Sequence, residues 1–148
     1  MLLFLAVFSG VLVLDFTVKH IIEKHPASYW RKKKALRVFP LDRVHNHGMI
    51  LGLAKQIPAL AKSLPVVMLA IGSILLFLLE HGAKKSRTSL AIAAGLILGG
   101  GACNALERIK KGYVVDYIHL PIRPIRHITF NLSDFSIFAG LLWFLSRL

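Results

Sequence analysis

The chain has 148 residues, of which 55% are hydrophobic, and its mean hydropathy is +0.63. This composition is too apolar for a water-soluble domain of that size, so it indicates a single domain embedded in a membrane. The net charge of +12 comes from basic residues between the apolar runs, where anionic lipid headgroups are the nearer partner. We expect phospholipids and not nucleic acid as that partner, because the sequence carries none of the usual nucleic-acid-binding signatures.

The first apolar segment, residues 1–22, is long enough to cross a bilayer. It contains Asp15 and Lys19, which share one face of a helix because they are four positions apart. Two interpretations stay open: an ion pair directed into the helix bundle, or a pair that positions a substrate. No basic region precedes the apolar run and no small-residue cleavage site follows it, so we expect an anchor and not a cleaved signal peptide.

A polar region, residues 23–62, follows the first segment and is interrupted by prolines. Alternating apolar residues around Leu36, Val38 and Leu41 predict short strands, and residues 50–62 predict a small amphipathic helix on the membrane surface. His45 and His47 form an H-x-H pattern that could bind a metal if it lay on a strand. Further ligands at metal spacing are missing from the sequence, so we favour a polar rim and expect no metal site.

Three further apolar segments, residues 63–80, 88–108 and 129–146, predict three more transmembrane helices, which makes four in all. The glycine run 99–101 predicts that a neighbouring helix approaches closely. The single cysteine, Cys103, excludes an internal disulfide and a cysteine metal cluster. We expect it to be a small buried packing residue.

Two carboxylates flank the connection between the last two apolar segments. Asp116 follows the third segment, and Asp134 lies about one turn into the fourth, after the good N-cap residue Asn131. The connection, residues 117–133, contains arginines and prolines and cannot cross the hydrocarbon core, so both aspartates lie on one side of the membrane. Ionisable groups at this depth are functional candidates. The alternative is that each aspartate pairs with an arginine or caps a helix.

The third segment ends with a polar face directed toward the same end as Asp116. Asn104, Glu107 and Arg108 are three and four positions apart and therefore share that face. A proton-relay subunit that uses Asp15, Glu107 and Asp116 as carriers is a further interpretation. It would require polar residues through the depth of the helices, whereas here the charges gather at one end.

Five motifs, in order along the chain, resemble those of signal peptidase II, the lipoprotein signal peptidase of bacteria. One such motif would be weak evidence, whereas five in sequence at helix ends are specific. They are D-x-x-x-K at Asp15 to Lys19, N-x-G at Asn46 to Gly48, G-x-x-N-x-x-x-R at Gly101 to Arg108, G-Y-V-V-D at Gly112 to Asp116, and F-N-x-x-D at Phe130 to Asp134.

The resemblance implies an all-α membrane aspartyl endopeptidase with four transmembrane helices. A small extramembrane β-cradle and a surface helix would lie between helices 1 and 2. Asp116 and Asp134 would be the catalytic pair, sharing one proton as two close carboxylates do. The substrate would be a prolipoprotein carrying a diacylglyceryl group on its lipobox cysteine, cleaved just before that cysteine.

The resemblance further implies an enzyme of the bacterial inner membrane that needs no metal or organic cofactor, and we expect a monomer. Other residues of the five motifs would support the catalytic pair or bind the substrate backbone or the lipid headgroup. These residues are Asp15, Lys19, Asn46, Gly48, Asn104, Glu107, Arg108 and Asn131.

Three positions depart from the family pattern. Glu107 stands where aspartate is usual, Leu51 where an aromatic residue is usual, and Ser133 where alanine is common. Glu107 keeps the charge but lengthens the side chain beside the predicted site. The changes at Glu107 and Leu51 favour the alternative of a paralogous, non-catalytic protein that binds lipoproteins or lipids on the same scaffold.

The distribution of basic residues conflicts with the orientation that the resemblance implies. Of the 19 lysines and arginines, 15 lie on the aspartate side, so the positive-inside rule would place that side in the cytoplasm. The resemblance implies an extracytoplasmic active site with both termini cytoplasmic. We follow the resemblance, because lipobox cleavage follows translocation and a basic platform can hold anionic headgroups.

Overall fold

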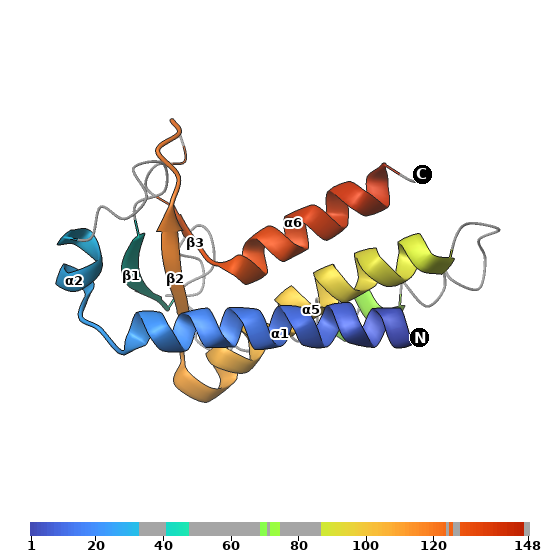
Figure 1. Cartoon of the computed structure of the whole chain (residues 1–148), viewed down its shortest axis with the longest axis horizontal. Coiled ribbons are helices and arrows are strands. Elements are labelled where there is room, and N and C mark those ends of the chain that lie inside the picture. The colour runs from blue at the N-terminus through green and yellow to red at the C-terminus, as the bar shows by residue number, and fades with distance from the viewer. Residues whose placement is uncertain are drawn as a thin grey trace.

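The computed structural model describes residues 1–32, 41–47, 69–70, 72–74, 87–123, 125 and 128–146. This part of the chain is mostly helical with one small sheet (Figure 1). Its helices are α1 (Leu2–Glu23), α2 (Ala27–Lys32), α5 (Arg87–Lys111) and α6 (Leu132–Leu145), and its strands are β1 (Leu41–Asn46), β2 (Val114–His119) and β3 (Thr129–Phe130).

Within the described residues, α1 and α5 are long and apolar enough to cross a membrane, whereas α6 has only 14 residues. The first and third predicted segments therefore correspond to α1 and α5. The fourth segment corresponds to α6, which begins three residues later than predicted because residues 129–130 form β3. The helix predicted over residues 50–62 lies outside the described residues, as does most of the span predicted over residues 63–80.

Helix α5 packs against both α1 and α6, and glycines make these contacts close. A Cβ atom at Gly99 would lie 3.0 Å from the backbone oxygen of Phe8 in α1. A Cβ atom at Gly100 would collide with the backbone oxygen of Ser133 in α6. The close helix approach predicted from the glycine run is confirmed, since any side chain there would push the helices apart.

The sheet is antiparallel with the strand order β1-β2-β3. It joins the segment after α1 to the connection between α5 and α6, at the end of the helices away from the chain termini (Figure 1). Val44 of β1 pairs with Asp116 of β2. The prediction of a strand is therefore confirmed at Leu41, while Leu36 and Val38 lie outside the described residues. Strand β1 brings Asn46 beside the residues that follow α5.

Asp116 follows the third helix, as predicted, but it lies in a strand and not directly at the helix end. Helix α5 ends at Lys111, and Gly112 turns the chain with a φ of 79°, a conformation that favours glycine. Asp116 then lies in the middle of β2, where Val115 is fully buried and packs with Ile22 and Tyr117 in a small core. The strand is buried over most of its length, so it lacks the polar alternation that identifies a strand from sequence.

Candidate active site

Asp134 is held in the first turn of α6 by a capping box. The side-chain oxygen Oδ1 of Asn131 accepts a hydrogen bond from the Asp134 N–H at 2.9 Å. In return the Asn131 N–H donates to Oδ2 of Asp134 at 3.0 Å. The predicted N-cap role of Asn131 is confirmed, and the reciprocal bonds restrict the Asp134 carboxylate to one orientation.

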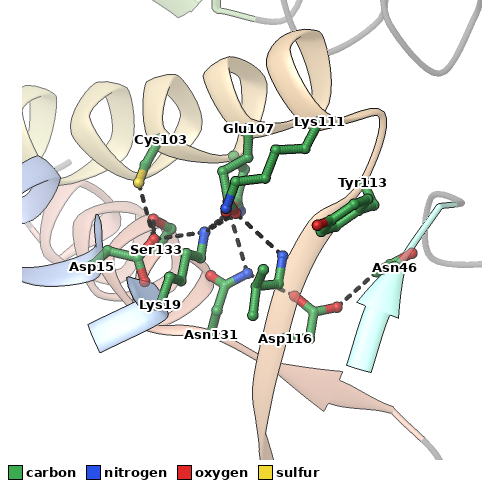
Figure 2. A network of polar contacts seen from close by, with 12 residues as sticks. Asp15, Lys19, Asn46, Cys103, Glu107, Lys111, Tyr113, Asp116, Asn131 and Ser133 are labelled. Carbon is green, nitrogen blue, oxygen red and sulfur yellow. Dashed lines mark hydrogen bonds and ion pairs between the residues drawn. The ribbon is translucent and has the colours of Figure 1, made fainter. Parts of the chain in front are cut away.

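Asp116 faces the same asparagine from the sheet. Its Oδ1 accepts from Nδ2 of Asn131 at 2.8 Å, and its Oδ2 accepts from Nδ2 of Asn46 at 2.8 Å. Figure 2 shows Asp116 between these two amides. Asn131 is fully buried and bonds both aspartates, so it joins the start of α6 to the middle of β2.

Burial raises the pKa of Asp116 to about 6, because a carboxylate with 3% exposure has lost most of its water. The negative charge of Asp134 adds to this increase, while the amides of Asn46 and Asn131 oppose it by donating to the ionised form. The charge of Asp134 therefore acts on Asp116, as expected of two neighbouring carboxylates. Such a pair can supply an acid and a base together.

Asn104 connects Asp134 to the interior of the helix bundle. Its Nδ2 donates to Oδ1 of Asp134 at 2.9 Å, and its Oδ1 accepts from Lys19 Nζ at 2.9 Å and from Asn131 Nδ2 at 3.2 Å. An ammonium group can only donate, so Lys19 requires the amide oxygen of Asn104 to face it. The amide N–H₂ is thereby directed at Asp134.

Lys19 lies between two buried carboxylates. Its Nζ is 2.7 Å from Oδ2 of Asp15 and 2.9 Å from Oε2 of Glu107, and all three side chains have at most 1% exposure. The predicted pairing of Asp15 with Lys19 is confirmed, and of its two interpretations the burial favours the ion pair inside the bundle. A substrate could not contact either side chain without displacing the helices.

Glu107 reaches the sheet as well as the bundle. Its Oε2 also accepts the backbone N–H of Val115 at 3.2 Å, and its Oε1 accepts from Lys111 Nζ at 2.8 Å. The converging contacts are visible in Figure 2. Val115 directly precedes Asp116, so Glu107 fixes the strand at the position next to that aspartate.

The sequence matches the family described as "Signal peptidase (SPase) II" over residues 7–148. The chain belongs to the signal peptidase II family. The family resemblance stated from the five motifs is therefore confirmed, and the chain is a membrane protein and a protease that removes signal peptides.

Relatives in this signal peptidase II family have similar length. The chain is 31% identical over 132 residues to the lipoprotein signal peptidase of Buchnera aphidicola subsp. Acyrthosiphon pisum (strain Tuc7), which covers 89% of this chain and 82% of the relative. It is 29% identical over 142 residues to the lipoprotein signal peptidase of Aquifex aeolicus (strain VF5), with 94% and 81% covered.

Two solved structures of a bacterial membrane enzyme, both obtained by the in meso method, share the fold of this signal peptidase II. The structure at 2.3 Å has a TM-score of 0.73 and 18% identity and covers 97% of this chain and 85% of its own. The structure at 1.9 Å has a TM-score of 0.72 and 19% identity, with 97% and 90% covered.

Sequence reasoning about this signal peptidase II missed Tyr117. Its hydroxyl donates to Oδ1 of Asp15 at 3.2 Å and accepts the Leu132 N–H at 3.0 Å, so it joins α1, β2 and the start of α6. Burial raises the pKa of Tyr117 well above its usual range, which keeps the hydroxyl protonated as a donor. The available sequence signal was a tyrosine directly after Asp116. Its partner Asp15 lies 102 residues away, so the sequence did not indicate the contact.

Two further donors to Asp15 were also missed. Ser133 Oγ donates to Oδ2 of Asp15 at 2.6 Å, and Cys103 Sγ lies 3.0 Å from the same oxygen. The predicted burial of Cys103 is confirmed, but its thiol is a hydrogen-bond partner as well as a packing group. The serine in place of the common alanine thus ties the first turn of α6 to α1.

The remaining predicted residues lie around the edge of the site. Arg108 is buried on α5, and its positive charge interacts with the negative charges of Asp116 and Asp134. His45 and His47 pack against the ring of Tyr113, with centroids 4.2 and 5.3 Å apart. Among the described residues, no group of three or more His, Cys, Asp or Glu side chains could hold a metal ion. Gly48 and Leu51 lie outside the described residues.

Proposed function

We propose that this signal peptidase II is an aspartyl endopeptidase in which Asp116 and Asp134 act as a catalytic pair. The observation that carries the proposal is that Asn131 bonds both carboxylates, through Nδ2 to Asp116 and through its backbone N–H to Asp134. The raised pKa of Asp116, about 6, supports it, because a general acid needs a pKa near the working pH.

The substrate is a prolipoprotein, as the names of the relatives indicate, cleaved just before a diacylglyceryl-modified lipobox cysteine. The ionised carboxylate takes a proton from water, whose oxygen attacks the scissile carbonyl carbon while the protonated carboxyl donates to the carbonyl oxygen. The resulting diol collapses when the newly protonated carboxyl donates its proton to the amide nitrogen, the other carboxylate takes a proton from a diol hydroxyl, and the C–N bond breaks. The aspartates return to one shared proton, and no covalent enzyme intermediate forms.

In this proposal the supporting residues hold the carboxylates of Asp116 and Asp134 in place and do not react themselves. Asn46, Asn104 and Asn131 each donate an amide hydrogen to a carboxylate oxygen, which keeps the two acids in reach of one water molecule. The charge of Arg108 stabilises the pair in its singly ionised state. No metal or organic cofactor takes part in this reaction scheme.

The lipid anchor provides the first test of this function. Purified protein is expected to cleave a lipobox peptide that carries a diacylglyceryl cysteine and to leave its unlipidated twin intact, measured by mass spectrometry of the products. Binding of the lipidated peptide without cleavage would support the non-catalytic alternative. The glutamate at position 107, in place of the usual aspartate, was one argument for that alternative. Its contacts with Lys19 and Val115 weaken this argument, because the structure accommodates the longer side chain.

We further propose a monomeric, single-domain, four-helix protein of the bacterial inner membrane, with the aspartates at the extracytoplasmic face and both termini in the cytoplasm. The N-terminus and the end of α6 both lie at the end of the helices away from the sheet (Figure 1), which supports placing both on one side of the membrane. The apolar length of α1 and α5 supports membrane crossing.

Reporter fusions test this orientation. A fusion after Arg87 is expected to be active as a cytoplasmic reporter, and a fusion within residues 31–34 as an extracytoplasmic one. A cytoplasmic signal from the second position would reverse the proposed orientation and would agree with the positive-inside count.

A further inference from the structure

A chain of ion pairs connects the buried site with the protein surface. Lys111 Nζ lies 2.8 Å from Oε1 of Glu107 and 2.6 Å from Oε2 of Glu23. Lys111 is 34% exposed, Glu23 is 25% exposed and Glu107 is 1% exposed. Lys111 therefore joins a fully buried carboxylate to one at the surface (Figure 2 shows Lys111 beside Glu107).

The buried carboxylate of Glu107 has two separate tasks. Its Oε2 receives both Lys19 Nζ and the Val115 N–H, whereas its Oε1 receives Lys111. A carboxylate bonded through one oxygen can still rotate, and a second charged donor on the other oxygen restricts that rotation. Loss of Lys111 would leave a buried acceptor without this donor, which favours rearrangement of the carboxylate.

Rearrangement of Glu107 would affect both catalytic aspartates by short routes. Its bond to Val115 holds the residue directly before Asp116. Its ion pair with Lys19 holds the ammonium group that orients Asn104, and Asn104 in turn donates to Asp134. One misplaced carboxylate would thus displace both acids relative to each other.

We infer that Lys111, held at the surface by Glu23, is a positioning residue for the aspartate pair. Lys111 acts through Glu107. In the described part of the chain its ammonium group bonds Glu23 and Glu107 and neither aspartate. The inference rests on the proposed function of Asp116 and Asp134. It deepens that proposal by adding a partly exposed residue outside the five family motifs to the residues that position the aspartates.

The neighbouring Lys110 provides a matched control. Both lysines lie in the last turn of α5 and interact similarly with the negative end of the helix dipole. Lys110 is exposed, whereas Lys111 bridges Glu23 and Glu107. A difference between Lys110→Met and Lys111→Met therefore reports on the bridge and not on helix-end charge.

The kinetic experiment compares full-length variants in lipid bilayers with the diacylglyceryl lipobox peptide. Lys111→Met is expected to lower kcat about tenfold or more with KM changed less than about twofold, because geometry is lost while the substrate-binding surface stays intact. Lys111→Arg keeps a charged donor at this position, so its kcat should lie within about threefold of the wild-type value. Lys110→Met should match wild type. Equal kcat in Lys111→Met and Lys110→Met would overturn the inference.

Amide hydrogen exchange supplies a readout that needs no activity. The Val115 N–H is expected to exchange faster in Lys111→Met than in Lys110→Met, because its acceptor on Glu107 is less restrained. If wild type cleaves no peptide, the proposed function fails while this exchange result still stands. An unchanged exchange rate of the Val115 N–H in Lys111→Met would contradict the positioning inference even if the wild-type protein is active.

A second variant covers the case in which Lys111→Met does not fold. Glu23→Gln removes the outer charge but keeps Lys111 beside Glu107, and it is expected to lower kcat about threefold with unchanged KM. A Glu23→Gln protein with wild-type kcat would contradict the role of Glu23 as the holder of Lys111.

Discussion

Asp116→Asn and Asp134→Asn are each expected to lower kcat for the lipidated lipobox peptide by about 10⁴-fold or more, as loss of one member of a catalytic pair does. Asparagine keeps the size of each side chain but can neither take up nor release the shared proton. The measurement is single-turnover cleavage followed by mass spectrometry. A variant that retains more than a tenth of the wild-type rate contradicts the assignment of that residue.

Asp42→Asn is the matched control for this pair. Asp42 lies on β1 of the same sheet, with its Oδ2 3.9 Å from His119, whereas the side chains that bond Asp116 and Asp134 in the described part of the chain are those of Asn46, Asn104 and Asn131. The change removes the same charge from the same sheet, and we expect the cleavage rate to stay within about twofold of wild type.

The stability of Asp116→Asn distinguishes lost chemistry from lost folding. The pKa of Asp116 is about 6 in the folded protein and 3.8 for an unperturbed group, so the folded state binds a proton more tightly. The penalty for the ionised group is absent below about pH 4, grows between pH 4 and 6, and is complete above pH 6, where it reaches about 3 kcal/mol.

Removing this penalty should stabilise the variant at neutral pH. The amides of Asn46 and Asn131 both donate to Asp116, so an asparagine there mismatches one donor at a cost of about 1 kcal/mol. We expect a net gain of about 1 to 2 kcal/mol at pH 7 that disappears toward pH 4, measured by thermal unfolding in detergent. A lower Tm than wild type at pH 7 would show that the ionised carboxylate is needed for the fold.

Gly100→Ala is expected to have the second largest effect, on both folding and activity. The new Cβ would collide with the backbone oxygen of Ser133, and a backbone atom cannot move aside as the end of a flexible side chain can. Helix α6 must shift, at a cost of about 1 to 3 kcal/mol. Because Ser133 precedes Asp134, the shift also separates the two aspartates, and a misplacement of about 1 Å can cost about 100-fold in rate.

Gly10→Ala tests whether this effect comes from packing. Among the residues that the structure describes, no heavy atom outside the backbone of α1 itself and the two chain neighbours lies within 4 Å of a Cβ built at Gly10, so alanine there should leave the rate unchanged and stabilise the helix by up to about 1 kcal/mol. The measurements are Tm and cleavage rate in the same lipid. A Gly100→Ala protein that behaves like Gly10→Ala would refute the close contact between α5 and α6.

The residues of the proposed aspartate pair could be predicted from sequence because their signals are local. Asp134 stands three positions after an N-cap asparagine, and this spacing alone predicts a side chain turned back to the helix start. Asn104, Glu107 and Arg108 follow the helical repeat, so their common face was also predictable. The catalytic roles of these residues remain predictions that the experiments above address.

The sheet shows where local signals fail. β2 places Asp116 between buried neighbours, and a short buried strand has the same apolar pattern as the end of a helix. Its pairing with β1 joins residues about 70 positions apart, as in the bond between Asn46 and Asp116. Nothing in either segment alone specifies that pairing.

By itself the sequence determined that this chain belongs in a membrane and that its motifs are those of signal peptidase II, and it predicted that its two candidate acids share one side of that membrane. Apolar length, helical spacing and motif order carry this information within short stretches of chain. Only the tertiary structure decided which side chains meet: Lys19 with Asn104, Tyr117 with Asp15, and Lys111 with Glu23. These partners lie 85 to 102 residues apart, and their contacts depend on helix packing and strand pairing that no local pattern encodes.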